Sequence, residues 1–90
     1  MVHRNAKLLA KGYAPTMDVA QLMEKDRATV KRMVDRGLLR AVKDGPKMRY
    51  IDLESLEQYY RSDKNTAMAQ AVRAFRTKIV AEGLHAGSAT

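Results

Sequence analysis

The chain has 90 residues, with 17 lysines and arginines against 10 aspartates and glutamates, so its formal net charge is +7. A chain of this length is expected to fold as one domain, and with one Phe and no Trp its small core must consist of aliphatic residues, Met and Tyr. The absence of cysteine excludes disulfides, thiolate metal sites and cysteine nucleophiles, and no apolar run approaches the roughly 18 residues that cross a bilayer.

The first expected elements are a basic N-terminal segment and a short helix. Residues 1–12 have weak patterning and indicate a flexible basic arm or a short helix. Pro15 and Thr16 then mark a helix start, because a Thr side chain can cap the first backbone donors and Asp18 suits the positive end of the helix dipole. Apolar residues with helical spacing follow at Val19, Leu22 and Met23. We therefore expect a helix over residues 17–24.

A second short helix is expected over residues 27–36. Asp26 is the candidate for its cap, and Gly37 suits the left-handed position after its end. The apolar residues again have helical spacing, at Val30, Met33 and Val34. Because only two or three residues separate the two helices, they should form a tight helical corner.

After Gly37 the pattern changes to that of a β-hairpin. Residues 38–42 and 48–51 are short strand-like runs. Between them lies Lys43-Asp44-Gly45-Pro46-Lys47, whose Asp-Gly-Pro core is typical of a turn. The sequence thus predicts a hairpin with a basic tip.

Two further helices are expected towards the C-terminus. Asp52 can cap a helix whose apolar residues are Leu53, Leu56, Tyr59 and Tyr60. After a polar linker at residues 62–65, Thr66 can cap a last helix that ends near residue 83. The apolar residues of that last helix are Met68, Val72, Phe75 and Ile79. Residues 85–90 are small and polar, which indicates a disordered tail over residues 84–90.

The positive charge is concentrated in the middle of the chain. Residues 25–49 hold nine bases against three acids, whereas residues 13–24 and residues 50–62 each have a net charge of −2. Such a distribution indicates one charged surface that binds a polyanion, although basic charge alone does not separate DNA, RNA and lipid. Chance clustering of bases in a small basic protein is the alternative.

The order helix, tight turn, helix, basic hairpin and helix is that of a winged helix-turn-helix domain. Residues 15–60 resemble the small excisionase-type domains related to the MerR family. The resemblance rests on Asp18-Val19-Ala20 and Leu22-Met23 in the first helix, Asp26-Arg27-Ala28-Thr29-Val30 at the corner, Gly37-Leu38-Leu39 at its exit, Gly45 in the wing, Met48-Arg49 in the return strand and Ser55-Leu56-Glu57-Gln58-Tyr59 in the closing helix. The chain departs from the family in the turn between the two helices. Where the family has Gly and an apolar residue there, this chain has Glu24-Lys25. Glu is sterically disfavoured there if the turn needs a positive φ.

The resemblance implies a mainly α-helical fold with a small β-hairpin wing and an extra C-terminal helix. The expected parts of the chain are a flexible basic arm at residues 1–12, the winged helix-turn-helix DNA-binding domain at residues 13–62, the C-terminal helix at residues 63–83 and the disordered tail at residues 84–90.

The exposed side of helix 27–36 is the expected reading surface for DNA. The candidates in the half that would enter a major groove are Arg27, Ala28, Thr29, Lys31 and Arg32. Arg and Lys can donate to guanine O6 and N7 or to phosphates, and a small Ala can touch a thymine methyl. Thr29 is expected to contact a phosphate rather than a base. An ordinary solvated face is the alternative, which Asp35 mildly favours because an acid is unwelcome near phosphate.

In the hairpin, the candidates for DNA binding are Lys43, Lys47 and Arg49. A basic wing can straddle the DNA backbone and place an Arg in a narrow minor groove, where the potential is most negative. The resemblance assigns that role to Arg49, with a contact to the backbone alone as the alternative.

The last helix has two possible uses. Its apolar residues Met68, Val72, Phe75 and Ile79 can dock onto the domain and complete its core, or they can form a protein-interaction surface for a neighbouring protomer or a recombinase. The opposite side carries Gln70, Arg73, Thr77 and Lys78, which allow an additional phosphate contact.

The sequence contains no pattern that is typical of a catalytic or metal-binding site. His3 and His85 lie near opposite ends without a third ligand at a useful spacing, so we expect no metal site. There is no Gly-rich phosphate loop and no plausible Ser-His-Asp arrangement, so we expect no enzyme, no cofactor and no small-molecule effector. The chain starts without the continuous apolar block of a signal peptide. We therefore expect a cytoplasmic protein of a bacterium or phage, associated with the nucleoid when bound, and no membrane partner.

Three functions are compatible with this sequence. The resemblance implies an excisionase, or recombination directionality factor, that binds tandem sites on double-stranded DNA by head-to-tail self-association, bends the DNA and directs an integrase towards excision. The second is a small phage or mobile-element transcription regulator with the same fold. The third is a basic RNA-binding protein, which the expected burial of Tyr50, Tyr59 and Tyr60 disfavours because single-stranded RNA needs exposed aromatic rings for stacking.

Overall fold

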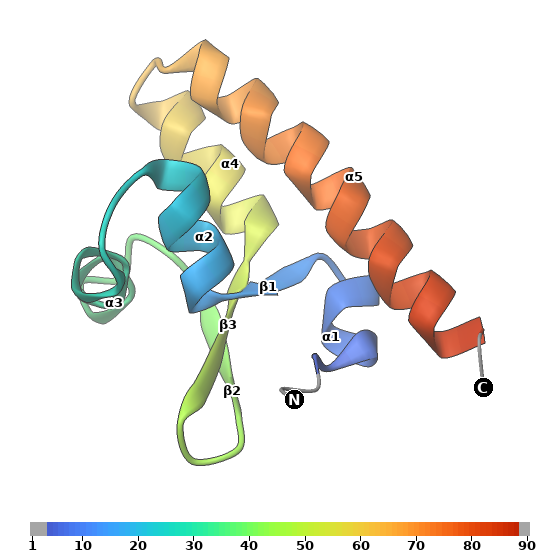
Figure 1. Ribbon diagram of the computed structural model, residues 1–90. Coiled ribbons are helices and arrows are strands. Elements are labelled where there is room, and N and C mark those ends of the chain that lie inside the picture. Colours follow the sequence, from blue (N-terminus) through green and yellow to red (C-terminus); the bar gives the residue numbers. More distant parts are fainter. Residues whose placement is uncertain (1–3, 89–90) are drawn as a thin grey trace.

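A computed structural model describes residues 4–88 of the chain (Figure 1). The elements follow in the order α1 (Ala6–Ala10), β1 (Tyr13–Pro15), α2 (Thr16–Met23), α3 (Arg27–Asp35), β2 (Ala41–Asp44), β3 (Met48–Asp52), α4 (Leu53–Ser62) and α5 (Thr66–Ser88). Within these residues, none of the helices combines the length and the apolar character that a membrane crossing requires.

The three strands form one antiparallel sheet in the order β1-β3-β2. Strands β2 and β3 form the predicted hairpin, although its first strand runs from Ala41 to Asp44 and not over residues 38–42, and we call residues 41–52 the wing. Gly45 at its tip has a φ of +81°, a conformation that residues with a Cβ rarely adopt. Strand β1 was not predicted from the sequence. It pairs with β3, with Tyr13 opposite Asp52, and so joins the N-terminal segment to the wing.

The core lies between the sheet and helices α2, α3 and α4, and it continues to buried residues of α1 and α5. Its fully buried side chains include Val19, Val30, Tyr50, Ile51, Leu53 and Leu56. As the composition predicted, this core consists of aliphatic residues, Met and Tyr. The predicted fold, a mainly α-helical winged helix-turn-helix with an extra C-terminal helix, is confirmed.

Two of the four predicted helix caps are confirmed and two are wrong. Asp26 and Asp52 each accept a hydrogen bond from the first turn of α3 and α4, respectively. Thr16 is instead the first residue of α2, and its hydroxyl donates to the carbonyl of Arg49 in the wing at 3.2 Å. Thr66 is likewise the first residue of α5. The cap of this helix is Asn65, whose Oδ1 accepts from Met68 N at 3.1 Å.

The last helix docks onto its own domain. At 23 residues it is roughly 34 Å long, enough to cover both α4 and α1, and Figure 1 shows it along one side of the molecule. Val72 and Ile79 are buried, and Met68 and Phe75 are packed partly buried against the same core. Of the two uses considered for these four residues, docking is the one observed, and it leaves Val72 and Ile79 inaccessible to a partner.

The structure decides two predictions about the ends of the chain. Of the two alternatives for residues 1–12, the short helix is observed from Ala6 to Ala10, and the flexible arm is wrong there, because α1 packs on α5 and buries Leu9 to 1% exposure. The disordered tail expected from residue 84 is helical through Ser88 as the end of α5. Residues 1–3 and 89–90 lie outside the described part of the chain.

Candidate nucleic-acid interface

The angle between α2 and α3 depends on a residue with a positive φ. Glu24 ends α2 with φ 56° and ψ 40°, in the left-handed region. Its neighbour Lys25 donates from N to the Ala20 carbonyl at 2.9 Å, which closes the turn and turns the chain into the cap of α3. The turn between α2 and α3 therefore does need a positive φ. Glu24 adopts this conformation although it has a Cβ.

The N-terminus of α3 is organised by Asp26. Its Oδ1 accepts from the backbone N–H of Thr29 at 2.8 Å and also from the Thr29 hydroxyl. These two hydrogen bonds hold the pKa of Asp26 below its ordinary value of 3.8, and the bond from the Thr29 hydroxyl has the larger effect. Arg32 Nη2 in turn donates to Thr29 Oγ1 at 3.3 Å. Thr29 therefore orients two side chains, that of the cap Asp26 and that of Arg32.

Helix α3 buries two of the three apolar residues on the side that the sequence predicted, and the third, Val34, is half-buried. Val30 is fully buried and Met33 is 9% exposed, whereas Arg27, Ala28, Lys31 and Arg32 are exposed. These exposed residues therefore lie on the surface of the domain and not in its core.

A groove of about 740 Å³ separates α3 from the wing. From α3 it is lined by Arg27, Ala28, Lys31 and Val34, and the basic residues that line it from the wing are Lys43, Lys47 and Arg49. Five basic side chains from two elements therefore converge on one groove, as expected for a surface that binds the backbone of a nucleic acid.

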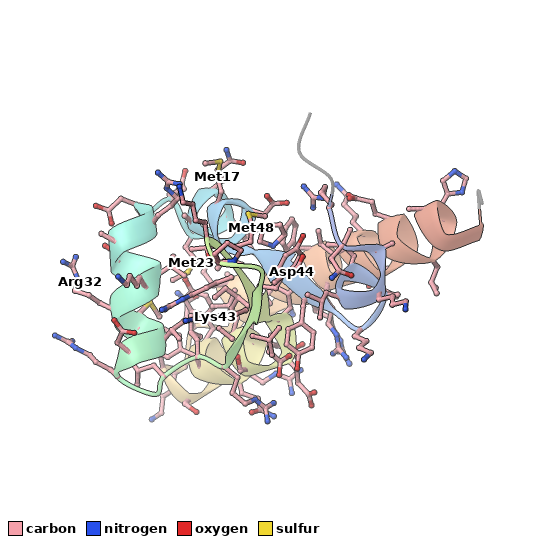
Figure 2. All side chains as sticks on the ribbon, turned by 90° about the horizontal axis from the view of Figure 1, so that it is seen from below. Met17, Met23, Arg32, Lys43, Asp44 and Met48 are labelled. Carbon is pink, nitrogen blue, oxygen red and sulfur yellow. The ribbon has the colours of Figure 1, made fainter. Side chains whose placement is uncertain are left out.

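Two of the predicted residues of α3 lie outside this groove. Figure 2 shows α3 beside the wing, with Lys43 between them and Arg32 on the side of α3 away from the wing. Thr29 is half-buried and bonded to Asp26. Sequence reasoning placed Arg27, Lys31 and Arg32 together, whereas the structure divides them between two sides of the helix.

Arg49 forms an ion pair with an acid of α3. Its Nη1 lies 3.7 Å from Asp35 Oδ1, and its carbonyl accepts from the Thr16 hydroxyl. The pair joins the wing to the C-terminal end of α3 across the groove. Asp35, which the sequence suggested only as an unfavourable neighbour for phosphate, thus pairs with Arg49 at the surface.

The groove also has lining residues that sequence reasoning missed: Arg4, Thr16, Met17, Asp18, Pro46 and Met48. No local pattern marks Arg4 and Met17 as members of a site, because the fold alone brings the N-terminal segment and the start of α2 beside the wing. Met17 of α2 and Met48 of the wing are labelled in Figure 2. Within residues 4–88, no cluster of three or more His, Cys, Asp or Glu is arranged to hold a metal ion.

Comparison with known proteins identifies the domain that carries this groove. No curated protein and no solved structure matches the chain significantly. A family model described as a helix-turn-helix domain matches residues 16–64, which contain α2, α3, the wing and α4 and make up more than half of the 90 residues. The chain therefore belongs to the helix-turn-helix domain family, and its match to this family supports sequence-specific binding of double-stranded DNA.

Proposed function

We propose that this protein is an excisionase, a DNA-binding architectural protein that occupies tandem sites, bends the DNA and directs an integrase towards excision. The observation that carries its DNA-binding part is the groove between α3 and the wing with its five basic side chains. In this role the protein provides architecture, and the recombinase performs the bond breakage.

On DNA, α3 enters the major groove and the wing lies over the adjacent backbone. Arg27 and Lys31 face the groove beside the wing and donate to guanine O6 and N7, with Ala28 close enough to approach a thymine methyl. Lys43 and Lys47 neutralise phosphates. Arg49, paired with Asp35, reaches for the minor groove.

Arg32 takes a different part in this arrangement. It points away from the wing and is oriented by Thr29. From there it reaches the DNA strand on the far side of α3, so it contributes to affinity more than to the choice of sequence.

The packing of α5 supports an excisionase over a MerR-type regulator. Such regulators pair through a helix that follows the winged domain, whereas α5 turns back and buries Val72 and Ile79 against its own domain. A helix used in this way does not provide a two-fold coiled coil. We therefore propose head-to-tail contacts between protomers on neighbouring sites, which direct repeats in the DNA would require.

An RNA-binding role has less support from the side chains. Tyr50 is fully buried and Tyr60 is 8% exposed, while Tyr59 is half-buried with its ring against that of Tyr60 at 5.3 Å between centroids. These rings are engaged in the core and do not form a stacking platform for unpaired bases.

The test is to recover DNA from the source genome with the purified protein. Sheared genomic DNA is bound at about 150 mM salt, where non-specific binding is weakened, and the enriched fragments are sequenced. We expect a narrow peak of tandem direct repeats beside an integrase gene or attachment site. Promoter peaks with inverted repeats would identify a transcription regulator instead. No enrichment over input would contradict sequence-specific DNA binding.

A further inference from the structure

One arginine connects the N-terminal segment with the DNA groove. Arg4 Nη2 lies 2.7 Å from Asp18 Oδ2 in the first turn of α2, and its Nε lies 2.7 Å from Glu82 Oε2 on α5. Both Arg4 and Asp18 line the groove, at the end where α2 begins. A single guanidinium thus joins α2, which belongs to the helix-turn-helix match, to α5, which lies outside it.

The position of Arg4 depends on how α1 sits on α5. A Cβ at Gly83 would lie 2.3 Å from Ala10 N and 2.7 Å from Ala6 O, so the two helices meet backbone to backbone at this glycine. Beside Arg4, the Asn5 N–H donates to the hydroxyl of the buried Tyr50 at 2.8 Å. The N-terminal segment is therefore held by α5 and by the wing, and Arg4 is placed by these contacts.

We propose that Arg4 is a positioning residue that neutralises Asp18 beside the DNA groove, so that the docking of α1 on α5 controls the affinity for DNA. This inference rests on the proposed binding of DNA in the groove. It extends the DNA site beyond the helix-turn-helix domain to residues at both ends of the described chain.

The physical reason is the charge of Asp18. Its side chain is 24% exposed and lies next to Thr16 and Met17 in the lining of the groove, where the phosphates of bound DNA would come close. A carboxylate there repels phosphate unless a cation compensates it. Loss of Arg4 leaves this carboxylate uncompensated, and we expect DNA to bind roughly tenfold more weakly as a result.

The experiment measures the affinity of the full chain for a mixed-sequence duplex of about 30 base pairs by fluorescence anisotropy at about 50 mM salt, because the effect of one charge does not depend on sequence. The variants are Arg4→Gln, Asp18→Asn, their combination, and Gly83→Ala with and without Asp18→Asn. Lys7→Gln is the matched control, since it removes the same charge from an exposed position of α1. Circular dichroism melting identifies any variant that is unfolded.

We expect Arg4→Gln and Gly83→Ala each to weaken binding roughly tenfold, and Asp18→Asn to restore both to within about threefold of wild type. Lys7→Gln should weaken binding only about twofold. If Gly83→Ala does not fold, the Arg4 and Asp18 variants alone decide whether the inference holds. Equal effects of Arg4→Gln and Lys7→Gln, or no restoration by Asp18→Asn, would overturn the inference. The latter result would show that Arg4 contacts phosphate itself or serves only the fold. No binding by the wild type would overturn the proposed function as well.

Discussion

At the scale of single residues, Glu24 is one of two non-glycine residues with a positive φ in the described part of the chain, the other being Lys64. Glu24 ends α2 with φ 56°, where a Cβ costs about 1–2 kcal/mol, and Gly avoids this cost but loses more entropy on folding. We therefore expect Glu24→Gly to raise the free energy of unfolding by about 0.5–1 kcal/mol, measured by urea denaturation. Glu24→Ala keeps the Cβ and is the control, for which we expect little or no gain. Equal effects of the two substitutions would show that the turn is not strained by its side chain.

At the scale of elements, α3 and the wing divide the work of recognition. Lys31 lies on α3 in the groove, so we expect Lys31→Ala to weaken binding to the cognate site by about 1–3 kcal/mol and to random DNA by less. Lys47 lies in the loop of the wing, and Lys47→Ala should weaken binding to all sequences and reduce the salt slope by about one. Arg32→Ala should behave like Lys47→Ala, because Arg32 points away from the wing. Titrations of cognate and random duplexes measure this division, and equal losses on both duplexes for Lys31→Ala would refute it.

For the whole molecule, the groove and not the total charge sets the dependence on salt. The net charge is +7, but only some of the basic side chains lie in the groove, namely five from α3 and the wing together with Arg4. If four to six phosphates are neutralised per protomer, the logarithm of the affinity should fall against the logarithm of the salt concentration with a slope of about −4 to −5. Anisotropy titrations over a series of salt concentrations measure this slope. A slope shallower than about −2 would show that the groove does not follow the DNA backbone.

The sequence by itself determined the order of the central elements, the buried side of α3, the caps at Asp26 and Asp52, and the hairpin with its basic tip. These features follow from the spacing of apolar residues and from side chains that bond within one turn, so neighbouring residues suffice to predict them. Only the tertiary structure decided that β1 pairs with β3, that α1 packs at Gly83, that Arg32 lies away from the wing, and that Arg4 meets both Asp18 and Glu82. Helix α1 has five residues and β1 has three, too few to show a period. The partners of Arg4 are distant in the chain, and packing of the folded chain alone brings them together.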